Sequence, residues 1–288
     1  HNLEMVAELI QALREANEVG SLGDPGAALA APLPYGRARQ RLFQAALDGI
    51  TAADFWEALK EYFEDPDEAV LACVELGLGG AFLDFAVFDW IPPDEATGRT
   101  FADRFLSAPP LMAADERRAC EALRRSEVQL LEAVATGTPH GPVPCRDRPG
   151  RRPTLITPPD DMLLVRWDWV LGRVMPTAPD AGVLLYGMRF PPGAAQAVGR
   201  DVARRSAELA RSAAREGRPR NAAHAQRAAA AITMAAMVAE AARGDGPRLQ
   251  DVDGDDVVFC EAVFDVVDTQ ALNAALARPI SRSPCRQT

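Results

Sequence analysis

Lysine and histidine are scarce in this sequence, and no long apolar run is present. Lys60 is the single lysine among 31 lysines and arginines, a bias that we attribute to a GC-rich genome. This bias makes chance clusters of arginines more frequent. No stretch of about 18 apolar residues exists, and no basic region followed by an apolar segment opens the sequence. We expect no membrane span and a cytoplasmic location.

The cysteines are few and dispersed. There are five, with no CxxC spacing: Cys73, Cys120, Cys145, Cys260 and Cys285. This pattern is typical of reduced thiols and not of a disulfide framework. His140 and Cys145 are two candidate metal ligands in a turn-rich stretch, but a structural zinc site normally needs four. We expect no metal, and no thiol paired with a histidine for catalysis.

The overall charge is negative. A formal net charge of −10 and a pI near 4.9 argue against a general polyanion binder, because the summed field repels phosphate backbones and anionic lipids. A local basic face is compatible with this charge. Hydrophobic residues make up 48% of the 288 residues, enough for a folded core in a chain longer than one typical domain of about 100–150 residues.

Residues 1–125 carry the apolar spacing of helices. Val6, Ile10 and Leu13 follow one another at steps of three and four, and Thr51 stands as an N-cap three residues before Asp54. A further helix is predicted to begin at Asp65 and to end near Gly77. The continuous apolar run at residues 81–90 fits a buried helix or a strand. We favour the helix.

Residues 126–192 change to the alternation and turn punctuation of strands. Strands are predicted at residues 128–134, 143–146, 154–157, 162–174 and 183–190. They indicate a small antiparallel β-barrel or curled sheet in the middle of a mostly helical chain. The predicted fold class is therefore α+β.

The predicted strand at residues 162–174 gives the clearest pattern. Its alternate positions share one apolar face: Leu163, Val165, Trp167, Trp169 and Leu171. This spacing favours a buried core face over an aromatic platform for a ligand, the alternative that we considered. On that interpretation, Trp167→Ala should destabilise the fold by about 3–5 kcal/mol.

Residues 193–288 return to helix. A helical pair is predicted at residues 194–216 and 222–243, followed by a strand at 256–268 and a short helix at 269–277. On the first of these helices, four arginines fall within roughly 60° of one another. They are Arg200, Arg204, Arg211 and Arg215. They fit either a solvated face paired with acidic neighbours or a surface that binds nucleic acid.

Several segments together resemble a known group of proteins. These are FAVFDW at residues 85–90, FADRFL at 101–106, RRSEVQLLEAV at 124–134, DWVLGRVMP at 168–176 and DVDGDDVVFCEAVFDVVD at 251–268. The pattern is similar to that of bacterial proteins without an assigned reaction that often end in the SEC-C zinc motif. The resemblance implies a helical N-terminal part and a small β module. Of the zinc ligands of that motif, the segment at residues 280–285 offers Cys285 alone, so we expect no zinc there.

No catalytic set stands out from these patterns, and no cofactor is predicted. Our preferred hypothesis is a non-enzymatic binding or adaptor protein that engages another macromolecule, with a protein as the expected partner. The alternative is a nucleic-acid-associated protein that uses the arginine face of residues 193–243. The third hypothesis is an enzyme in which Asp84, Asp89 and Asp94, close to the aromatic segment, supply the acids.

Overall fold

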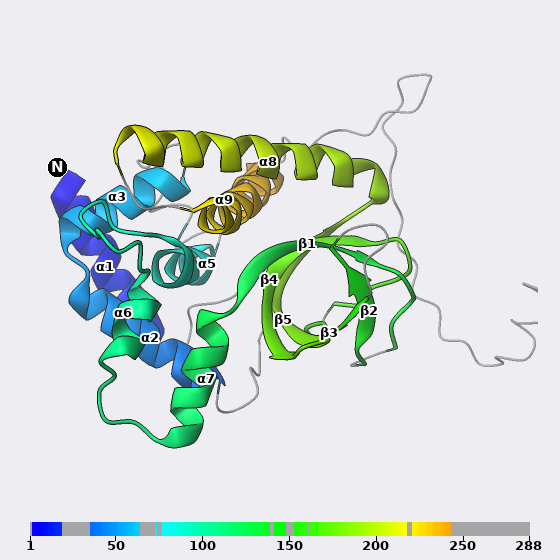
Figure 1. The fold of residues 1–288 in the computed structure, drawn as a ribbon, viewed down its shortest axis with the longest axis horizontal. Helices are drawn as coiled ribbons and strands as arrows, with labels where there is room; N and C mark the ends of the chain where they lie inside the picture. Colours follow the sequence, from blue (N-terminus) through cyan, green and yellow to red (C-terminus); the bar gives the residue numbers. More distant parts are fainter. Residues whose placement is uncertain are drawn as a thin grey trace, which may run out of the picture. The chain divides into compact units, whose positions relative to one another are not determined.

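The chain runs from helices into a small barrel of strands and back into helices (Figure 1). The computed structural model describes residues 2–18, 35–63, 73, 77–138, 141–147, 153–160, 162–217 and 221–243. All of these belong to the unit His1–Asp245. The α+β class is confirmed. The helix predicted from Asp65 lies largely outside the described residues, as do the strand and short helix predicted after residue 243 and the thiols of Cys260 and Cys285.

The described residues before the barrel are mostly helical. The helices are α1 (Asn2–Glu18), α2 (Tyr35–Gly49), α3 (Ala52–Tyr62), α5 (Gly79–Asp84), the π-helix η2 (Phe85–Asp89), α6 (Phe101–Ser107) and α7 (Ala114–Arg124). Thr51 caps α3 as predicted, because its hydroxyl accepts from the Asp54 N–H at 3.1 Å. Thr100 and Asp103 form a reciprocal capping box at the start of α6.

The apolar run at residues 81–90 is helical, as we favoured, but its second half is a π-helix. The Trp90 N–H donates to the carbonyl of Phe85, five residues earlier, at 2.8 Å. Every residue of α5 and η2 is buried. Short π-helical turns of this kind are rare and concentrate at functional or structurally special positions.

The strands close into a five-stranded barrel. They are β1 (Glu127–Ala133), β2 (Val143–Arg146), β3 (Thr154–Thr157), β4 (Trp169–Ala178) and β5 (Ala181–Phe190), hydrogen-bonded in the order β1-β2-β3-β5-β4 and back to β1. Four pairs are antiparallel, but β3 and β5 run parallel. The prediction of an all-antiparallel module was therefore wrong for this pair. Because β4 pairs with β1 and with β5, the strand left to close the barrel against β3 is β5, and it runs parallel to β3. This is a small closed Greek-key barrel, an architecture that hosts many functions.

Strands β4 and β5 approach each other closely where two glycines face each other. Gly172 pairs with Gly187. A Cβ on Gly172 would lie 2.4 Å from the Tyr186 carbonyl oxygen and 2.8 Å from the Gly187 Cα. A side chain at this position would therefore force the two strands apart.

The apolar side chains of the strands belong to two clusters, one on each face. The barrel interior contains Leu131, Ala133, Val143, Cys145, Ile156, Leu164, Val170, Val174 and Leu184. The opposite face of β4 and β5 contributes Leu171, Met175, Leu185 and Tyr186 to the larger core shared with the helices. The larger core thus joins the outer face of β4 and β5 to the helices, and the barrel interior forms a separate cluster.

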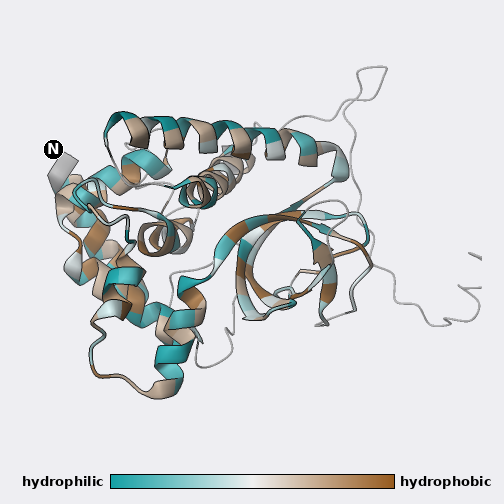
Figure 2. Ribbon diagram, in the orientation of Figure 1, coloured by the Kyte–Doolittle hydropathy of each residue, from teal (hydrophilic) through white to brown (hydrophobic). Residues whose placement is uncertain are grey.

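Two long helices complete the described chain, α8 (Pro192–Arg215) and α9 (Ala222–Arg243). Hydrophilic residues recur along the whole of α8, whereas α9 is mostly neutral or hydrophobic beyond its first turn (Figure 2). A helix that is apolar all round is expected to be buried. Accordingly, α9 contacts α8, α3, η2 and strands β1, β4 and β5.

Asp103→Asn is expected to lower stability at neutral pH by about 1 kcal/mol and to have no effect in acid. Burial alone would raise the pKa of Asp103, but hydrogen bonds from Arg124 and Thr100 outweigh it and hold the pKa below its usual value. A carboxylate with a lowered folded-state pKa stabilises the protein above its unfolded pKa, and that contribution disappears as the pH falls through the folded pKa. Urea unfolding of both proteins at neutral pH and in acid measures this. An equal difference at both pH values would contradict the assignment.

Candidate functional site

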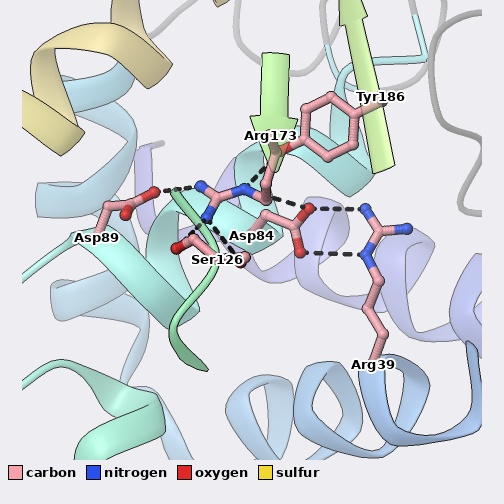
Figure 3. Close-up of polar contacts among 6 residues, drawn as sticks. All are labelled: Arg39, Asp84, Asp89, Ser126, Arg173 and Tyr186. Atoms are coloured by element: carbon pink, nitrogen blue, oxygen red, sulfur yellow. Dashed lines mark hydrogen bonds and ion pairs between the residues drawn. The ribbon is translucent and has the colours of Figure 1, made fainter. Parts of the chain in front are cut away.

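Two buried carboxylates of the helical part converge on one arginine of the barrel. Asp84 ends α5 and Asp89 ends η2, five residues later. On a regular α-helix such residues point about 140° apart, but the π-helical turn brings them round to the same side. Arg173 projects toward them from β4 (Figure 3). All three side chains are fully buried.

The arginine is held on every side. Its guanidinium forms a short ion pair with Asp89 Oδ2, and its Nε lies 3.7 Å from Asp84 Oδ2. The Nε donates to the Tyr186 hydroxyl at 3.0 Å, and Nη1 donates to the carbonyl and hydroxyl of Ser126 at 3.4 and 3.3 Å. This cluster therefore ties η2, β1, β4 and β5 together.

A second arginine, Arg39 from α2, completes the network. Its Nε and Nη2 donate to Asp84 Oδ1 and Oδ2 at 3.1 and 2.9 Å (Figure 3). This two-point geometry is the strong form of the arginine–carboxylate pair. Two carboxylates thus balance two guanidinium groups, which is the condition for burying charges without a large penalty.

The pKa shifts follow from burial and pairing. Burial raises the pKa of Asp89, and Arg173 offsets part of this rise; Asp89 Oδ1 has no hydrogen-bond partner among the described residues. Burial alone would lower the pKa of Arg173, but Asp89, Tyr186 and Asp84 raise it well above its usual value. The network is a structural link in which Asp84, Asp89 and Arg173 are fully buried and Arg39 is partly exposed. It does not include Asp94, which is exposed, so the three acids of the enzyme hypothesis do not form one site.

The sequence held a signal for this network that we did not use. Asp84 and Asp89 interrupt a fully apolar run, and Arg173 interrupts an apolar strand. Buried charges require partners of opposite sign. The two aspartates in an apolar run therefore predict a buried basic partner, and the arginine in an apolar strand predicts a buried acidic one. What the sequence does not reveal is the π-helical turn that aligns the two carboxylates.

The clearest exposed feature is a turn at residues 165–168, where a strand was predicted. β4 begins at Trp169 and not at Met162. Trp167 is 50% exposed, with Leu163 at 47% and Val165 at 37%. The predicted core face is therefore wrong over this segment. Leu164, from the opposite parity, is the residue that packs in the barrel interior, as Val170 of the same parity does on β4.

The backbone of this turn is strained at Trp167. Its φ is +79°, and it is the one non-glycine residue of the described chain with a positive φ. The Asp168 N–H donates to the Val165 carbonyl at 3.0 Å, which makes this a type II turn with Trp167 at the position that normally requires glycine. For an L-residue this conformation costs about 1–2 kcal/mol.

Hydrogen bonds fix the turn in place. The Trp167 N–H donates to the Ala133 carbonyl at 2.9 Å, the Gly137 N–H donates to the Leu164 carbonyl at 2.9 Å, and the Val165 N–H donates to Asp168 Oδ2 at 2.8 Å. Arg189 Nη1 donates to the Leu163 carbonyl at 3.1 Å. A turn with this many partners is preorganised, so little conformational entropy is lost when it binds.

Three apolar side chains and one cation project from this preorganised turn. We call Leu163, Val165, Arg166 and Trp167 the Trp167 surface. The Arg166 guanidinium lies over the indole, 4.4 Å from the ring centroid. It forms no ion pair with any residue that the structure describes. The Trp167 ring is thus exposed and not part of the core, whereas Trp169, the second ring of the aromatic platform that we considered, packs against the core.

Comparing glycine with alanine at position 167 isolates the strain. We expect Trp167→Gly to be more stable than Trp167→Ala by about 0.5–1 kcal/mol, because glycine adopts a positive φ without a Cβ clash. Both variants lose the indole, so the difference reports the backbone alone. Chemical denaturation measures it. A more stable alanine variant would mean that the turn relaxes to a negative φ.

The predicted arginine face of α8 is exposed. Arg200, Arg204, Arg211 and Arg215 all reach solvent, and Val198 and Ala213 on the opposite side are buried. Arg204 is bound by Asp201 at 2.5 Å and Glu208 at 3.1 Å, which is the solvated-face interpretation. Arg200, Arg211 and Arg215 form no ion pair with any described residue.

The remaining candidate groups do not gather into a site. Burial raises the pKa of the Cys145 thiol to about 12 and that of Cys120 to about 11, which keeps both protonated. His140 lies outside the described residues. Among the described residues, no three His, Cys, Asp or Glu side chains come together as metal ligands. Within the same part of the chain, no helix has the length and apolarity to cross a bilayer.

Comparison with known proteins gives no relative. No family model, no curated protein and no solved structure matches this chain. The resemblance to bacterial proteins that end in the SEC-C motif therefore stays a prediction. The fold and the surfaces define the class: an α+β protein in which a small Greek-key barrel, linked to helices by buried ion pairs, presents a rigid apolar turn.

Proposed function

We propose that this protein is a non-enzymatic binding or adaptor protein that engages another macromolecule through the Trp167 surface. The observation that carries the proposal is the half-exposed Trp167, held at a φ of +79° and preceded in the chain by exposed Leu163 and Val165. Strained backbone that the rest of the fold keeps in place is characteristic of functional positions. Exposed apolar side chains that cluster mark interaction surfaces.

The backbone conformation at this position does not call for a tryptophan. Glycine would fit the backbone without strain, and a polar residue would expose less apolar surface. Aromatic residues on rigid supports are, in contrast, frequent anchors of protein–protein interfaces. An interaction role accounts for both the exposure and the strain.

Site-specific photo-crosslinking in cells that make the protein tests this proposal. Val165 is replaced by a benzophenone amino acid in the complete chain, and Ala203, exposed on α8, serves as the control position. We expect a discrete macromolecular adduct from position 165 that is absent from position 203. The same adduct should fall strongly when Trp167→Ala is added.

Two outcomes of the crosslinking experiment would contradict the proposal. The absence of an adduct at position 165 would overturn the proposal. An adduct that persists with Trp167→Ala would remove the tryptophan from the interface.

A second function, association with nucleic acid, is favoured by one specific observation. Arg200, Arg211 and Arg215 are exposed on one face of α8 without an acidic partner among the described residues. Arginines placed in this way neutralise phosphates and release counterions. The net charge of −10 opposes this candidate, which is why it ranks second.

Salt dependence tests the second function. Binding of a labelled single-stranded oligonucleotide and of a duplex is measured near 50 mM salt, where phosphate contacts are strongest. The variant Arg200→Gln/Arg211→Gln/Arg215→Gln should reduce the slope of log K against log salt by about three. Arg118→Gln, an exposed arginine on α7, is the matched control. No detectable binding by the wild type would exclude this function.

A further inference from the structure

We infer that the partner of the Trp167 surface is a peptide segment that carries an apolar side chain beside a carboxylate. This inference rests on the proposed function and names the chemistry of the occupant. Leu163, Val165 and Trp167 supply the apolar contact, and Arg166 supplies the charge.

The charge of the surface selects an acidic partner. Two arginines lie at the turn, but Arg189 Nη1 lies 3.6 Å from Asp168 Oδ2 and is balanced by it. Arg166 is exposed, forms no ion pair with a described residue and keeps its positive charge. Its guanidinium lies over the Trp167 ring and donates no side-chain hydrogen bond to a described residue, so its donors can form two parallel hydrogen bonds to a carboxylate.

The apolar part selects a peptide over a nucleic acid. Two of its three side chains, Leu163 and Val165, are aliphatic and offer no flat ring on which a base could stack. A single-stranded nucleic acid is bound by aromatic platforms along a groove with several cations. Here one aromatic ring stands beside one unbalanced cation, which fits a short acidic and apolar peptide.

The rigid turn is suited to a short ligand. Backbone and side-chain hydrogen bonds fix Leu164, Val165 and Trp167 before any partner arrives. Most of the conformational entropy lost on binding is therefore lost by the peptide and not by the turn. A few contacts are then enough for measurable affinity.

Selection from a displayed library of random 12-residue peptides against the complete protein tests the inference. Peptides that also bind the Trp167→Ala variant are removed first. We expect the enriched sequences to combine Asp or Glu with Leu, Ile, Val or aromatic residues. For an enriched peptide, Trp167→Ala should weaken binding about thirtyfold, and Arg166→Glu about tenfold or more. Arg118→Glu, remote in the sequence, should leave the affinity unchanged.

The outcomes separate the inference from the function on which it rests. If no peptide is enriched, or if the enriched peptides lack carboxylates and ignore Arg166→Glu, the inference is wrong. A labelled oligothymidylate that binds the wild type and is lost with Trp167→Ala would also overturn it, while the proposed macromolecular role of the turn would stand. If neither the library nor the oligonucleotide distinguishes Trp167→Ala from wild type, and no adduct forms at position 165, both fail together.

Discussion

Arg173→Met is expected to lower the free energy of unfolding by about 3–5 kcal/mol, the largest effect predicted for any charged residue here. The variant leaves Asp89 fully buried without the guanidinium that binds it. Tyr186 and Ser126 also lose a donor. Chemical denaturation followed by circular dichroism measures the loss.

Two further variants make this prediction specific. Arg204→Met removes an arginine with two acidic partners on the surface of α8, and should cost no more than about 1 kcal/mol. Arg173→Met combined with Asp89→Leu should recover part of the stability, because no unpaired charge remains. A single Arg173→Met variant as stable as the wild type would mean that the network contributes nothing to the fold.

Phe82→Ala is expected to destabilise the protein by a similar amount, about 3–5 kcal/mol. Phe82 is fully buried at the centre of an aromatic cluster. Its ring centroid lies 5.2 Å from that of Phe55, 5.5 Å from Tyr62 and 5.9 Å from Phe63. Removing the ring opens a cavity that neighbouring side chains can fill only in part.

Trp167→Ala is the matched comparison for Phe82→Ala. Because the indole is half exposed, its removal should cost about 1–2 kcal/mol, and not the larger value expected of a core tryptophan. Urea unfolding of the two variants under the same conditions measures how much unfolding free energy each one loses. If Trp167→Ala proved as damaging as Phe82→Ala, the indole would be buried in solution and the Trp167 surface would not exist.

The failure at Trp167 shows where a period-two pattern stops being informative. Alternation identifies a strand and its two faces, but it does not say which face is turned inward or where the strand begins. Here the face that is apolar at positions 163, 165 and 167 is the outer one. The type II turn that decides this depends on hydrogen bonds to Ala133 and Gly137, some thirty residues earlier in the chain.

The sequence by itself determined the local structure of this protein. The cap at Thr51, apolar spacing, and Pro and Gly punctuation set where most helices and strands begin and end, because these signals act between residues close in the chain. The helix at residues 222–243 and the strands at 143–146 and 154–157 were predicted with the observed bounds. The amphipathic arginine face of α8 also followed from spacing alone.

Only the tertiary structure decided the features that involve distant segments. Closing the barrel required β5 to pair with β3 in parallel. Burying Asp84 and Asp89 required Arg173, a residue 84 positions after Asp89. Fixing Trp167 outward required the end of β1. Each of these features depends on contacts between residues that are distant in the sequence. The free energy of burying a charge or exposing a ring is set by those contacts and not by the neighbouring residues in the chain.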